Sequence, residues 1–335
     1  MADKKGSDKA FVMLETAHPI IVDTLTELFA TERVFRRGAP LPGLTRRSAK
    51  REPVDVKLAD FDGVEYQILV TPEAKDAVLF SMKMRCASQV MPMGAKLVLD
   101  ATFGQNLAHA AQTGYDVSVK YDLTKLSDAD KPKAIKSCSE LRYIVMGAPL
   151  ERCLEALSKD GSGSLKPMIV NYRPKEAMYV NPMADRILIF FTVDFFDDTD
   201  RAIATIFLNE FGEAQRRLQN APAVAFSKEP PGQLKAVPGF KESPNCVGYV
   251  MFTVFKLHVD KPEKIRNATQ LFLTFRSYLH YHIKAAKTQL QTRMRARVET
   301  MLKILNRANP ETLEAEKSAG RRNTTTNTMR TFRRF

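Results

Sequence analysis

The hydrophobic pattern predicts short helices and strands over most of the chain. Apolar residues at helical spacing predict a first helix at Pro19–Ala30. Alternating apolar positions flank Asp62-Gly63, which predicts a β-hairpin running from Val54 to Ile68. The same rules predict further strands at Ala77–Lys83, Tyr115–Leu123, Pro167–Tyr172, Ala177–Val180, Arg186–Phe195, Ala223–Ser227 and Val247–Leu257, and helices at Met93–Phe103, Pro132–Ser158 (bent near Gly147-Ala148-Pro149) and Asp200–Arg217.

The order of these elements is similar in the two halves of the chain. Each half reads helix, three strands, helix, then one or two strands, and short turns between strands favour antiparallel pairing. The expected fold class is α+β, with two topologically similar domains of antiparallel sheet plus helices, followed by a long C-terminal α-helix. The expected divisions are a disordered extension 1–12, a first domain 13–130 with a basic loop 31–53, a second domain 131–260, a long helix 261–309 and a basic disordered tail 310–335.

The long helix is the most informative element of the pattern. No glycine or proline occurs from Glu263 to Asn309, and the prolines at 262 and 310 fit its two ends. At 1.5 Å per residue it would be about 70 Å long, which exceeds the diameter of either small domain. One narrow apolar stripe runs its full length at spacings of three and four: Ile265, Ala268, Phe272, Phe275, Leu279, Ile283, Ala286, Leu290, Met294, Val298, Met301 and Leu305.

The second half of this stripe has no remaining sequence in the chain to cover it. We therefore expect a binding face for a partner helix at Ala286, Leu290, Met294, Val298, Met301 and Leu305. Two alternatives remain at this point: the helix folds back across the first domain, or it forms a coiled coil with a second copy of the chain. In each case packing must stabilise it, because an isolated helix is marginal in water.

The charge of the chain is concentrated beside the same helix. The formal net charge is +13, and it comes from two segments, Thr31–Glu52 and Pro262–Asn309. Few pairs of opposite charge can form along the helix, so an acidic partner surface is favoured over a merely solvated face. The candidate contacts to such a surface, for which actin, nucleic acid and anionic lipid are the alternatives, are Lys287, Arg293, Arg295, Arg297, Lys303 and Arg307.

Catalytic and cofactor motifs are not found in the sequence. There is no phosphate-binding loop of the GxxxxGK[ST] type, no GxGxxG after a strand, and no HExxH. The four cysteines form no CxxC pair, which predicts reduced and mostly buried thiols. We expect no enzyme, no cofactor, no metal, no transmembrane segment and no signal peptide, hence a cytoplasmic protein. An alternative function is nonspecific binding of nucleic acid or anionic lipid through the basic loop and tail; specific nucleic-acid recognition is not expected.

Several segments resemble the subunit 2 family of the actin-related protein 2/3 complex. The most specific are the run from Phe275 to Lys284 (FRSYLHYHIK), the run from Thr292 to Ala296 (TRMRA) and the run from Leu305 to Ala308 (LNRA). The segment from Ala59 to Tyr66 (ADFDGVEY) and the segment from Phe226 to Pro231 (FSKEPP) are also similar. The resemblance covers roughly 13 to 310, whereas the first twelve residues, the segment 31–53 and the tail depart from the family pattern.

The resemblance implies a non-catalytic scaffold. Members of the family have two similar α/β domains and a long helix that packs against the long helix of subunit 4 of the same complex. They help to hold the two actin-related subunits and the remaining subunits, and they contact the side of the mother actin filament. The resemblance therefore implies actin binding in support of filament nucleation and branching, in the cytoplasm and the cytoskeleton, at cortical actin and cell projections.

Overall fold

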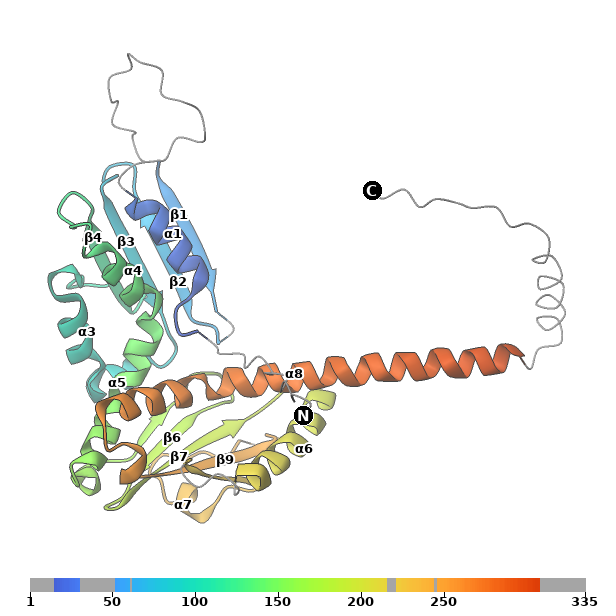
Figure 1. Ribbon diagram of the computed structural model, residues 1–335. Helices are drawn as coiled ribbons and strands as arrows, with labels where there is room; N and C mark the ends of the chain where they lie inside the picture. The colour runs from blue at the N-terminus through green and yellow to red at the C-terminus, as the bar shows by residue number, and fades with distance from the viewer. Residues whose placement is uncertain (1–14, 31–51, 61, 216–220, 244–245, 308–335) are drawn as a thin grey trace, which may run out of the picture. The chain divides into compact units, whose positions relative to one another are not determined.

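The computed structural model describes residues 15–30, 52–60, 62–215, 221–243 and 246–307 (Figure 1). The chain divides into two compact units, Met1–His280 and Tyr281–Phe335, and each is described by itself. The predicted extension 1–12, almost all of the predicted loop 31–53 and the predicted tail 310–335 lie outside the described residues.

The first sheet is antiparallel and its four strands follow chain order, β1-β2-β3-β4. Gly63, at the turn of the β1–β2 hairpin, has a φ of 77°, as the Asp-Gly signal predicted. The strands are β1 (Val54–Ala59), β2 (Glu65–Val70), β3 (Ala77–Lys83) and β4 (Val117–Asp122), and the helices before and between them are α1 (Pro19–Phe29), α2 (Ala87–Val90) and α3 (Ala95–Phe103). Short 3-10 turns lie at Met91–Met93 and Gly104–Asn106.

The second sheet is also antiparallel and has the strand order β5-β6-β7-β9-β8. It repeats the plan of the first sheet, in which a strand after a helix returns beside the third strand, and it adds β8 at the edge. The strands are β5 (Met168–Val170), β6 (Met178–Pro182), β7 (Arg186–Val193), β8 (Ala223–Ser227) and β9 (Gly248–Phe255). The helices are α4 (Lys131–Ser139), α5 (Leu141–Ser158), α6 (Asp198–Gln215), α7 (Gly232–Lys235) and α8 (Pro262–Arg307), with 3-10 turns at Ser162–Ser164 and Lys256–His258.

The α+β fold class and the long C-terminal helix predicted from the sequence are confirmed, with one local correction. The predicted single helix with a bend near Pro149 is two helices that separate at Glu140, and α5 continues through Pro149. The turns of α5 around Pro149 are buried from Val145 to Leu150. Packing on both sides therefore holds the helix together although the proline removes a backbone donor.

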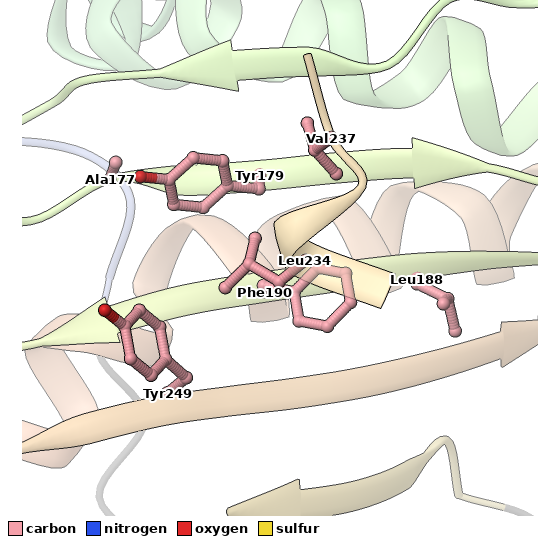
Figure 2. Packing of buried hydrophobic residues seen from close by; sticks show 7 residues of the cluster. All are labelled: Ala177, Tyr179, Leu188, Phe190, Leu234, Val237 and Tyr249. Atoms are coloured by element: carbon pink, nitrogen blue, oxygen red, sulfur yellow. The ribbon is translucent and has the colours of Figure 1, made fainter. Parts of the chain in front are cut away.

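Strand β7 is apolar at nearly every position because the second sheet is covered on both faces. Leu188 and Phe190 point to one face, where Leu234 of α7 and Val237 pack with Tyr249 of β9 (Figure 2). The alternate residues of β7 point to the opposite face, where α8 packs. This two-sided burial explains why the strand has no alternation of apolar and polar residues.

The turn of the first hairpin carries two carboxylates that face a buried arginine. Oδ1 of Asp60 accepts hydrogen bonds from the backbone N–H groups of Asp62 and Val64, each at 2.9 Å. Oδ2 of Asp60 lies 3.0 Å from Nη1 of Arg142 on α5. The second terminal nitrogen of Arg142 donates to the carboxylate of Asp62. One guanidinium therefore holds both acidic side chains of the turn.

The ion cluster continues into the second sheet and α8. Arg173, which lies between β5 and β6, donates to Asp62 at 3.2 Å and to Glu176 at 3.0 Å. Nε of Arg276 on α8 donates to the same Glu176 carboxylate at 3.0 Å. The cluster therefore links the first hairpin, α5, the second sheet and α8 by charge-assisted hydrogen bonds.

The two acids of the cluster that contact Arg173 titrate differently. Burial acts to raise the pKa of Asp62, but the charge and hydrogen bond of Arg142, with Arg276 and Arg173, outweigh burial and hold that pKa below its usual value. For Glu176, burial outweighs the nearby arginines and raises its pKa. Because the folded-state pKa of Asp62 is lowered, its ion pairs stabilise the fold above the unfolded-state pKa of about 3.9. This contribution is lost as the pH falls through the folded-state value.

We predict that Arg142→Met strongly destabilises the protein. The change leaves two buried carboxylates without their main cation, which costs about 3–5 kcal/mol. The midpoint of thermal unfolding, followed by circular dichroism at neutral pH, should fall by at least about 5 °C. The difference in unfolding midpoint between the variant and the unchanged protein should become smaller at acidic pH, because a protonated carboxyl group needs no cation.

The matched control is Lys83→Met, which removes an exposed ion pair to Glu65. Exposed pairs contribute about 0–1 kcal/mol, so this variant should unfold close to the unchanged protein. Equal shifts for the two variants would contradict the role given to Arg142.

Candidate interaction surface

Helix α8 runs without interruption from Pro262 to Arg307 (Figure 1). Within the first unit its apolar side packs on aromatic residues of the second sheet. The ring of Phe275 lies 5.0 Å from Phe191 on β7 and 4.9 Å from Phe252 on β9, between ring centroids. Phe272 packs edge-on against Phe252 at 5.3 Å. These contacts fix which side of α8 is the apolar side.

Helix α5 crosses α8 at a glycine. A side chain added at Gly147 would have its Cβ 3.2 Å from Cγ2 of Thr269 and 3.3 Å from Cδ1 of Leu273. The absence of a side chain there lets the two helices approach closely. The anchored part of α8 is therefore held by aromatic packing, by this crossing and by the Arg276 ion pair.

The second unit contains the rest of α8, and the predicted apolar stripe is exposed there from Leu290 to Leu305, whereas Ile283 is buried. The exposed fractions are 44% for Leu290, 56% for Met294, 56% for Val298, 63% for Met301 and 56% for Leu305. Ala286 is half-buried. Within the described part of the chain, therefore, no segment covers these five side chains. Exposed apolar surface of this extent is typical of a binding face.

The sequence analysis missed two apolar residues at the end of this face. Leu302 is 52% exposed and Ile304 is 60% exposed. Both lie beside the narrow stripe rather than on it, because they do not fit the spacing of three and four residues that defines the stripe. They widen the apolar face in the last turns of α8, where a wide apolar arc is typical of a helix packed into a core.

The predicted basic contacts lie on the same segment. Arg293, Arg295, Arg297 and Lys303 are exposed, as is Arg307, whereas Lys287 is half-buried. Glu299 is the one acidic residue between Lys284 and Arg307. The segment is therefore strongly basic around its apolar face.

Three of the four cysteine thiols are buried and protonated. Burial raises the pKa of the Cys138 thiol to about 12 and that of the Cys86 thiol to about 11. Cys153 is buried too, and burial raises its pKa to about 11. A nucleophilic cysteine needs a lowered pKa, so these three behave as packing residues.

The described residues contain neither a membrane-spanning helix nor a metal-binding cluster. None of the helices within those ranges is long and apolar enough to cross a bilayer. No group of three or more histidine, cysteine or acidic side chains there is arranged to hold a metal ion.

Comparisons with known proteins agree on one family. The sequence model described as "Arp2/3 complex, 34 kD subunit p34-Arc" matches residues 80–312. A protein of Dictyostelium discoideum named actin-related protein 2/3 complex subunit 2 is 33% identical over 261 residues, covering 77% of this chain and 86% of its own length. A protein of the same name from Schizosaccharomyces pombe is 33% identical over 302 residues, covering 83% of this chain and 94% of its own length.

Both the family match and these relatives cover most of the chain, and the family match includes the second sheet and α8. The family consists of structural subunits of a complex rather than enzymes, as the sequence predicted. The chain therefore belongs to the 34 kD subunit family of the Arp2/3 complex.

Proposed function

We propose that the chain is a non-catalytic scaffold subunit that pairs through α8 with the long helix of subunit 4 of its complex. It also contacts the mother actin filament through basic side chains of α8, and so supports filament nucleation and branching. The observation that most directly supports the proposed pairing is the exposed apolar stripe from Leu290 to Leu305. Membership of the family supports the choice of another subunit of the complex as the molecule that covers it.

The energetics favour a permanent partner over an exposed helix. Burying a leucine, methionine or valine side chain is worth about 1.5–3 kcal/mol. Five such side chains stand on one side of the segment, at Leu290, Met294, Val298, Met301 and Leu305. A helix from another protein laid along this side would remove them from water together, and it would also stabilise the helical conformation of a segment that is marginal alone.

The proposed location is the cytoplasm, in association with the actin cytoskeleton, at cortical actin and cell projections. It follows from family membership and from the proposed filament contact. The alternative of nucleic-acid or lipid binding would rest on the segments 31–53 and 310–335, which lie outside the described residues except for the last two residues of the first. We do not propose it.

Replacing Met294 by aspartate tests the pairing. We predict that Met294→Asp abolishes copurification with a co-expressed subunit 4 homologue, because an uncompensated buried charge costs about 3–5 kcal/mol, which weakens binding more than about hundredfold. The control is Thr292→Asp, since Thr292 lies about 200° around the helix from Leu290. The control should copurify normally. Retention of subunit 4 by Met294→Asp would rule out pairing through this stripe.

Reversing two basic residues tests the filament contact. We predict that Arg293→Glu combined with Arg295→Glu weakens cosedimentation of the assembled complex with actin filaments at low salt. Because salt screens exposed charges, filament binding by the unchanged complex should fall as ionic strength rises. The difference in cosedimentation between the unchanged complex and the variant should therefore become smaller.

The matched control for this test is Lys120→Glu with Lys133→Glu, which changes the net charge equally at exposed positions outside α8. These changes should leave cosedimentation nearly unaltered. If both double variants bind filaments equally, the basic side of α8 is not the filament contact.

A further inference from the structure

Arg297 lies on the apolar side of α8, unlike Lys303. Successive residues of an α-helix are about 100° apart, so Arg297, seven positions after Leu290, is about 20° from it around the axis. Lys303 is about 140° from Leu290 and about 180° from Met294. Two basic residues of the same segment therefore face different surroundings once the stripe is covered.

The repeat of the stripe confirms this placement. Apolar residues recur every 11 positions, which matches the helix at about 3.67 residues per turn. One column continues from Ala268 through Leu279 and Leu290 to Met301, and a second from Phe272 through Ile283 and Met294 to Leu305. The third column is Phe275, Ala286 and Arg297. Its first member is buried against the second sheet.

A charge at the third place of that column needs an opposite charge. Any helix that covers Leu290 and Met301 also covers Arg297, which lies between them along the same side. A buried guanidinium without a carboxylate is strongly unfavourable. Glu299 cannot serve from this segment, because it lies about 180° from Leu290 around the helix.

We propose that Arg297 sets the register of the helix pair by binding a carboxylate of the partner helix inside the apolar contact. The partner's chemistry follows: an amphipathic helix with one aspartate or glutamate among apolar residues, placed opposite Arg297. A single buried polar position of this kind is a known way to fix register at some loss of stability. The inference rests on the proposed pairing, and it removes Arg297 from the residues available to the filament.

The test compares the same substitution at two positions of the full chain, co-expressed with a subunit 4 homologue. Arg297→Asp should weaken pairing by more than about hundredfold, since it places two carboxylates together inside the contact. Lys303→Asp makes the same change in net charge on the opposite side of the helix and should stay within about threefold of the unchanged chain. Arg297→Lys keeps the charge and should restore most of the affinity.

The specific partner residue is found by rescue. In a set of subunit 4 variants, each acidic residue of the long helix is changed to arginine, and one should recover pairing with Arg297→Asp while pairing poorly with the unchanged chain. Equal affinities for Arg297→Asp and Lys303→Asp, whether both high or both low, would overturn the inference. If Met294→Asp still pairs, the proposed function itself fails. If Met294→Asp loses its pairing with subunit 4 while Arg297→Asp keeps it, the pairing stands and only the role of Arg297 is wrong.

Discussion

The exposed apolar stripe of α8 is the constraint on which this account depends. Seven large apolar side chains from Leu290 to Leu305 are exposed to solvent in the described part of the chain. The hydrophobic effect is nondirectional and scales with the apolar area removed from water. Such a surface therefore stabilises the binding of any molecule that can cover it. A non-catalytic protein with an exposed apolar helix face is suited to hold other proteins together. Membership of the family places the chain in such an assembly.

The part of α8 within the first unit is held by a buried ion cluster and by aromatic packing. Arg276 joins α8 to Glu176, and through Arg173 and Asp62 to Arg142 and the first hairpin. Aromatic packing on β7 and β9 holds the same turns of the helix. Buried networks of charge-assisted hydrogen bonds rigidify a structure, so this cluster holds that part of α8 firmly on the second sheet.

Local patterns predicted the elements well and the long-range contacts poorly. The Asp62-Gly63 turn and the strand Ala77–Lys83 were predicted from spacing and turn chemistry alone. The break at Glu140 was missed because no glycine or proline marks it in the sequence. Arg276 and Glu176 are 100 residues apart, and no local signal relates them. The domain limits remain predictions. The roles of the basic residues also remain predictions, because charge alone does not reveal which molecule a side chain contacts.

The most direct measurement of the central claim is site-specific photo-crosslinking in the purified assembly. A photoreactive amino acid in place of Met294 should form a crosslink to another polypeptide, identified by mass spectrometry as subunit 4. The same amino acid in place of Thr292 should give little of that product, since it faces away from the stripe. A crosslink from position 294 to the chain's own sheets, with none to a second protein, would contradict the account.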